Sequence, residues 1–140
     1  MIGETNPYGP APGMALWPYP LGCSGWRLCF KILKMKSSDY IKKFDRVNLV
    51  DGDWDLKLAS KRASELEHES RILLGTRVCQ AHGVEFKPFS FVGSKRFRAL
   101  ILPHPSGRSR SWNLEGSVDR ARLLVEAFTA PTQERKTDDE

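Results

Sequence analysis

The stretch Ala99-Leu100-Ile101-Leu102-Pro103-His104-Pro105-Ser106-Gly107 decides the fold, because it joins a continuous apolar run to a stiff turn. Four consecutive apolar residues predict a buried strand of the kind found in parallel sheets. The prolines on both sides of His104 fix their own φ and restrict the residue before each of them, so the imidazole is carried on a stiffened backbone. The small residues then turn the chain towards Arg108 and Arg110. This combination predicts a site for a phosphate-bearing ligand beside an acid or electrophilic step.

The rest of the chain alternates apolar stretches with amphipathic helical patterns. This alternation predicts an α/β fold, a three-layer α/β/α domain with a small, mostly parallel four-stranded sheet. The pattern predicts strands at 46–50, 71–75 and 97–102, and helices at 24–36, from 37 or 38, from 53 or 55 to 69, at 76–83 and at 114–128. We expect Ser24, Asp53 or Asp55, and Thr76 to cap three of these helices. Residues 84–92 are expected to be irregular or extended, and a domain at 1–129 precedes a polar tail at 130–140.

Composition bounds the class of protein without deciding its function. The chain has 140 residues, of which 40% are hydrophobic and 28% charged, as expected for one globular domain. Its net charge of +5 weakly favours an anionic partner. No apolar run is long enough to span a membrane and no signal peptide is visible, so we expect a cytoplasmic protein. Three cysteines without close pairing predict a reducing compartment, and the histidines lack metal-ligand spacing, so we predict no metal or other cofactor.

A second informative segment lies near the start of the chain. Gly3-Glu4-Thr5-Asn6-Pro7-Tyr8-Gly9 offers a carboxylate, an amide and an aromatic ring between glycines that permit a sharp turn. Together with the 103–107 segment, it resembles the two signature motifs of the uracil-DNA glycosylase superfamily. In that family a Gly-x-Asp/Asn-Pro-Tyr/Gly or Gly-Glu-x-Pro-Gly loop follows the first strand, and a His-Pro-Ser loop follows the last. Residues 46–49 and 73–75 resemble two further landmarks in the same order, and the similarity is greatest to short bacterial or phage members.

The resemblance implies hydrolysis of the N-glycosidic bond of a uracil or another damaged or modified base flipped out of DNA. His104 would donate a hydrogen bond to the base carbonyl as negative charge develops there. Glu4 would be the general base or would stabilise the sugar cation, and a purely structural role for it in the turn is the competing interpretation. Asn6 would position water. We expect a monomer whose partner is DNA, with no iron–sulfur cluster.

Three further residues are candidates for binding the base. Tyr8 would wall the pocket against a 5-substituent, and Asn48 would recognise a base edge through its amide. Asn48 could equally be a strand-end residue that bonds to backbone. Trp17 or Tyr19 would stack on the flipped base, although packing in the core is the more common role for such residues.

The turn after His104 supplies the candidates for DNA binding. Ser106 and Gly107 would approach a phosphate through hydroxyl and backbone N–H groups. Arg108 would fill the vacated stack or grip the strand, and Arg110 would contact a phosphate. Solvation of both arginines is the alternative.

Two other functions stay open at this point. One is the same chemistry on a modified base of phage DNA, as in defence against phage. The other is a DNA-binding protein that has lost catalysis, because Asn6 stands where relatives have an acid. Only Met1 and Ile2 precede Gly3, which leaves almost no first strand. We therefore expect the start of the sheet to be incomplete or unusually compensated, and a chain extended upstream to be more stable and more active.

Overall fold

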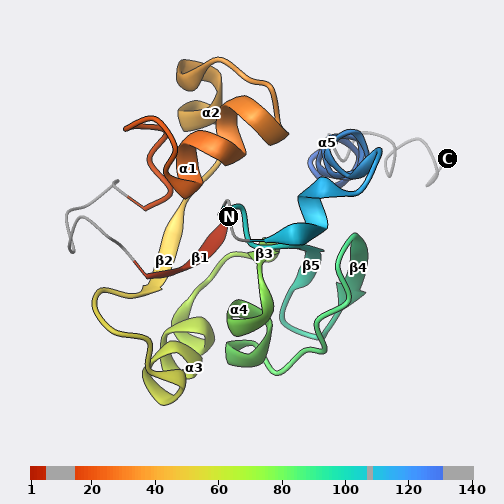
Figure 1. Cartoon of the computed structure of the whole chain (residues 1–140). Helices are drawn as coiled ribbons and strands as arrows, with labels where there is room; N and C mark the ends of the chain where they lie inside the picture. Colours follow the sequence, from red (N-terminus) through yellow and green to blue (C-terminus); the bar gives the residue numbers. More distant parts are fainter. Residues whose placement is uncertain (6–14, 107–108, 131–140) are drawn as a thin grey trace, which may run out of the picture.

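The computed structural model describes residues 1–5, 15–106 and 109–130, with backbone only at residues 4 and 5. It contains one five-stranded sheet in the order β2-β1-β3-β5-β4 (Figure 1). The strands are β1 (Ile2–Thr5), β2 (Val47–Val50), β3 (Ser70–Leu74), β4 (Ser90–Gly93) and β5 (Arg98–Leu102). Neighbouring strands from β2 to β5 are parallel, and β4 is antiparallel to β5. The protein is therefore α/β with a mixed, mostly parallel sheet.

The sheet differs from the sequence-based prediction at two strands. The expected near-absence of a first strand is wrong, because β1 lies between β2 and β3 and pairs with both. Gly3 and Glu4 consequently belong to a strand rather than to the loop after it. The expected count of four strands is also too low, because β4 forms from a segment predicted only as irregular or extended. It is a short edge strand with alternating half-buried and exposed residues, which gives little apolar signal.

The helices follow the predicted order but begin and end differently. They are α1 (Ser24–Trp26), a π-helical η1 (Arg27–Ile32), α2 (Ser37–Lys43), α3 (Leu56–Glu65), α4 (Thr76–Ala81), a 3-10 helix η2 (Arg110–Asn113) and α5 (Ser117–Phe128). Asp55 caps α3 as expected, by accepting the N–H of Leu58 at 3.2 Å. Ser24 is not a cap, because the thiol of Cys23 accepts the N–H of Trp26 at 3.4 Å.

Thr76 does not cap its helix either. Gly75 is the N-cap of α4, with a φ of 97° that an L side chain rarely adopts. The backbone must turn sharply there because β3 passes directly into the helix.

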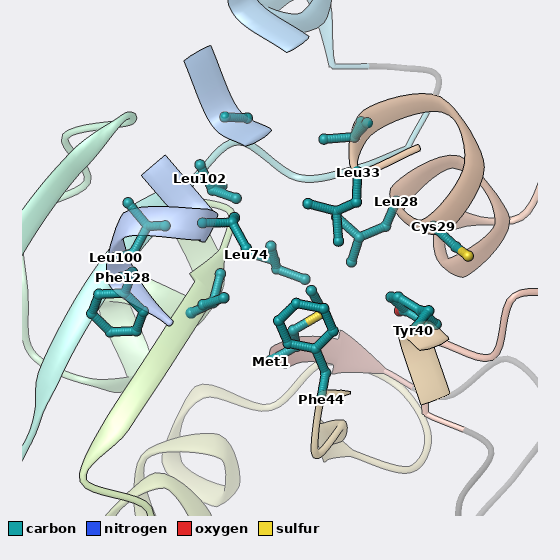
Figure 2. Close-up of a cluster of buried hydrophobic side chains, with 14 residues drawn as sticks. Met1, Leu28, Cys29, Leu33, Tyr40, Phe44, Leu74, Leu100, Leu102 and Phe128 are labelled. Carbon is teal, nitrogen blue, oxygen red and sulfur yellow. The ribbon is translucent and has the colours of Figure 1, made fainter. Parts of the chain in front are cut away.

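Helices pack against the sheet on both sides, and the strands alternate accordingly. Leu100 and Leu102 of β5 contribute to one cluster of buried side chains, whereas Ala99 and Ile101 contribute to another. The first cluster also holds residues of η1, α2 and α5 (Figure 2), and the second holds residues of α3 and α4. In Figure 1, α1, α2 and α5 accordingly lie on the opposite side of the strands from α3 and α4.

Candidate functional site

The carboxyl ends of the parallel strands lie at one edge of the sheet. Thr5 pairs with Val50, and Leu74 pairs with Leu102. Gly75 donates its N–H to the carbonyl of Leu102 at 2.9 Å, and this hydrogen bond keeps the carboxyl ends of β3 and β5 next to each other. Parallel sheets bind ligands at this edge, so the turns that leave it are the first place to look for a site.

His104 lies in the turn after β5 and is half-buried between the buried Pro103 and Pro105. Its Nδ1 accepts the backbone N–H of Ser106 at 3.1 Å. A nitrogen that accepts a hydrogen bond carries no proton, so the ring proton of His104 resides on Nε2. The turn therefore selects the tautomer in which Nε2 is a donor.

Trp112, for which no local pattern predicts a role, anchors the same turn. The indole Nε1–H of Trp112 donates to the carbonyl of His104 at 2.8 Å, and the carbonyl of Trp112 accepts from the Ser117 hydroxyl at 3.2 Å. The ring also meets Phe89 edge-on, with centroids 5.8 Å apart. These contacts tie the His104 peptide to the start of α5. A tryptophan in an otherwise polar run of serines and arginines was the available signal.

The structure places two of the four predicted DNA-binding residues. Ser106 is half-buried, and its backbone N–H is already donated to His104. Of the donors of Ser106, the hydroxyl is therefore the one left to meet a phosphate. Arg110 is exposed at the start of η2. Gly107 and Arg108 lie outside the described residues.

Asn48 is half-buried in β2, directly opposite Gly3 in β1. A Cβ on Gly3 would overlap the Oδ1 atom of Asn48 and would also touch the side chain of Leu16. The absence of a side chain at Gly3 is therefore what lets the Asn48 amide extend across β1. Spacing in the sequence gave no sign of this contact, because the two residues are far apart in the chain.

Trp17 lies in the segment that leads into α1, with the guanidinium of Arg46 5.3 Å from its ring centroid. Arg46 also donates to the carbonyl of Ala15 at 2.9 Å, and the Tyr40 hydroxyl donates to the carbonyl of Leu16 at 2.8 Å. These contacts hold residues 15–17 against the body of the protein. They give Trp17 a structural partner, and its stacking on a base stays a prediction.

The remaining predicted residues are placed in part or not at all. The backbone of Glu4 lies in β1, while Asn6 and Tyr8 lie outside the described residues. The structure thus brings Asn48 beside β1 and fixes the His104 turn at the same end of the sheet, with β1 and β3 between them.

A pocket of about 280 Å³ lies at the other end of the sheet, where its lining includes the first residues of β1, β2, β3 and β5. It is separate from the His104 turn. In the described part of the chain, no three His, Cys, Asp or Glu residues gather as a metal site, and no helix is long and apolar enough to cross a membrane. Comparison with known proteins found no matching family model, curated protein or solved structure.

Proposed function

We propose that the chain is a DNA glycosylase of the uracil-DNA glycosylase type. It would hydrolyse the N-glycosidic bond of a flipped uracil or other damaged or modified base and leave an abasic site. The proposal includes the three-layer α/β/α arrangement of that superfamily, with β4 added to its parallel strands. It also includes monomeric action on DNA in the cytoplasm.

The observation that carries the proposal is the hydrogen bond from the Ser106 N–H to Nδ1 of His104. As the bond to the sugar breaks, its electron pair moves to the base and negative charge develops on a base carbonyl. A neutral imidazole with its proton on Nε2 would donate to that oxygen without first changing its tautomer. One preorganised donor of this kind is worth roughly 100- to 1,000-fold in rate. The anchoring of the His104 carbonyl by Trp112 supports such preorganisation.

The opposite side of the base would face Asn48. Three strand spacings separate β2 from β5 in the sheet, or roughly 14 Å between backbones. The Asn48 amide, which extends across β1, narrows this gap from the β2 side. An amide offers a donor and an acceptor to a base edge, and the missing side chain of Gly3 gives the Asn48 amide its room. Tyr8 and Trp17 would complete the walls of the pocket.

Attack on the sugar would depend on Glu4 in β1 and on the residues that follow this strand. Water adds to the cationic sugar carbon and loses a proton, for which Glu4 is the proposed acceptor and Asn6 the proposed water-positioning group. The DNA strand itself would be held by Ser106, Gly107, Arg108 and Arg110, next to the His104 turn.

The test is incubation with oligonucleotides that each carry one candidate base: uracil, hypoxanthine, xanthine, or a hydroxymethylated or glucosylated pyrimidine. Abasic sites are then cleaved with alkali and counted. We expect strand cleavage with at least one of these substrates under single-turnover conditions. Binding without cleavage on every substrate would instead support a DNA-binding protein that has lost catalysis.

A further inference from the structure

Two pockets, of about 280 and 410 Å³, meet at the amino ends of the strands, because Ser70 and Arg98 line both of them. We call these two adjacent pockets together the amino-end groove. Its cationic lining comes from the end of α2, the start of β3 and the turn between β4 and β5. These residues are Lys43, Arg71, Lys95, Arg96 and Arg98, with His68 beside them. Its only carboxylates among the described lining residues are Asp45 and Glu69.

Arg71 shows that positive charge here is not balanced locally. It is only 4% exposed, and its guanidinium donates to the carbonyls of Ala63, Leu66 and His68 at 2.9–3.1 Å. No carboxylate of the described residues lies within ion-pair distance of it. Burial lowers the pKa of the Arg71 guanidinium, and repulsion by the nearby Arg96 lowers it further. Folding thus brings like charges together in this groove.

The two carboxylates of the groove offset only part of this charge. Asp45 faces His68, with 3.0 Å between its Oδ2 and the Nε2 of the imidazole. Glu69 is exposed and forms no ion pair with any described residue. The groove therefore has five lysine and arginine side chains but only two carboxylates among its described lining residues. This excess of positive charge makes it a favourable place for an anion.

Aromatic rings lie directly beside the cations. The Arg98 guanidinium is 4.5 Å from the ring centroid of Phe128 and donates to the Phe128 carbonyl and the Ser70 hydroxyl, each at 2.9 Å. Phe91 stacks on Phe128 with centroids 5.9 Å apart and an interplanar angle of 16°, yet Phe91 is 52% exposed. Phe128 lines the groove, and Phe91 extends this aromatic surface away from Arg98 to a position opposite Leu100 in β5. Exposed aromatic rings near basic residues are surfaces on which unpaired bases stack.

We propose that the amino-end groove binds a single-stranded segment of nucleic acid, with phosphates along its cations and a base on Phe91. The cations of this site are distinct from the His104 turn, because the five residues of β5 separate the two by roughly 16 Å. Phe91 lies opposite Leu100, midway along this strand. An acidic peptide would use the charges of the groove but not the exposed ring, so the ring favours a nucleic acid.

The test measures the affinity for fluorescently labelled 20-nucleotide oligothymidine by anisotropy across a series of salt concentrations. This probe contains none of the proposed substrate bases, so the result does not depend on base excision. Lys95→Glu with Arg96→Glu removes two cations of the groove. Lys57→Glu with Lys61→Glu makes the same change in net charge on the exposed side of α3 and serves as the control.

We expect the groove variant to bind at least about tenfold more weakly and to lower the slope of log affinity against log salt by roughly 1.4, or two phosphate contacts. The affinity and salt slope of the control should stay close to those of the wild type. Equal losses of affinity in both variants, or no loss of affinity in either, would overturn the proposal. Should the double variant fail to fold, Lys95→Glu alone replaces it, because Lys95 forms no hydrogen bond or ion pair with a described residue.

Phe91→Ala tests the base-stacking part of the same proposal. It should weaken binding about tenfold without changing the salt slope, because it removes a stacking surface and no charge. Unchanged affinity of Phe91→Ala would overturn the assignment of the groove to single-stranded nucleic acid.

Discussion

The two ends of the parallel sheet differ in how their polar groups are held. At the carboxyl end, backbone and indole N–H groups fix His104 and select one tautomer of its ring. At the amino end, Arg71 and Arg98 are tied to carbonyl and hydroxyl oxygens, and their charges gather beside Arg96 without matching acids. The first arrangement suits a single, oriented hydrogen-bond donor, and the second suits attraction of an anion by several charges. The two ends of one sheet can thus carry surfaces of different chemistry.

The largest expected effect is on the rate of excision, which should depend on the carboxyl end of the sheet and not on the amino end. His104→Ala should lower single-turnover excision by roughly 100- to 1,000-fold while DNA affinity changes little, since it removes one preorganised donor. His68→Ala, which alters a histidine of the amino-end groove, is the matched control and should leave saturated excision unchanged. A folded His104→Ala protein with wild-type excision would remove His104 from the mechanism.

Gly3→Ala probes the approach of β2 to β1 near the carboxyl end. The added methyl group would meet the Asn48 amide, so the variant should lose about 1–3 kcal/mol of unfolding free energy and should also excise more slowly. Chemical denaturation and single-turnover kinetics measure the two effects. Gly93→Ala is the control, because a Cβ there meets nothing within 4 Å. Equal stability of both variants would show that Asn48 does not need the space above Gly3.

Trp112→Phe should have a smaller effect on the same end of the sheet. It keeps an aromatic ring but removes the N–H that donates to the His104 carbonyl, which is worth about 0.5–1.5 kcal/mol. We expect a loss of stability of that size and a few-fold slower excision, measured beside Trp26→Phe. The indole N–H of Trp26 donates to no described group, so that control should behave like the wild type.

The smallest effect concerns His82, which lines a pocket beside Lys95 and Arg96. Burial and the charge of Arg71 lower the pKa of His82 below 6.5, against a hydrogen bond with the Val78 carbonyl that raises it. The unfolded chain therefore binds a proton more readily than the folded one, and stability falls as the pH drops below about 6.5. His82→Gln should show a smaller drop in urea midpoint between pH 7.5 and pH 5. The same drop in both proteins would assign the acid sensitivity to other groups.

Regular elements with a strong local signal were predictable from the sequence. The apolar runs of β3 and β5 and the Asp55 cap of α3 all occur close to their predicted positions. Elements whose signal depends on distant partners were not. β1 is a strand because β2 and β3 pair with it on both sides, and β4 is one because β5 offers it a partner.

The same distinction applies to the candidate site. Prolines and a following serine indicated a fixed His104 from local sequence alone, but its tautomer depends on a hydrogen bond that only the folded turn forms. The contact between Gly3 and Asn48 and the anchoring by Trp112 arise from packing between separate segments. The split of the basic residues between two ends of the sheet likewise requires the topology. Lys95 and Arg96 precede β5, so they lie at the end of this strand opposite to His104.

The most direct test of the central claim is the identity of the product. DNA that contains a mixture of damaged and modified bases is treated with the protein, and the small molecules released are identified by mass spectrometry and counted against new abasic sites. The account predicts one free base in equal number with the abasic sites, and release of both products roughly 100- to 1,000-fold more slowly by His104→Ala. Release of nucleosides or nucleotides, or no release from any DNA by the wild-type protein, would contradict it.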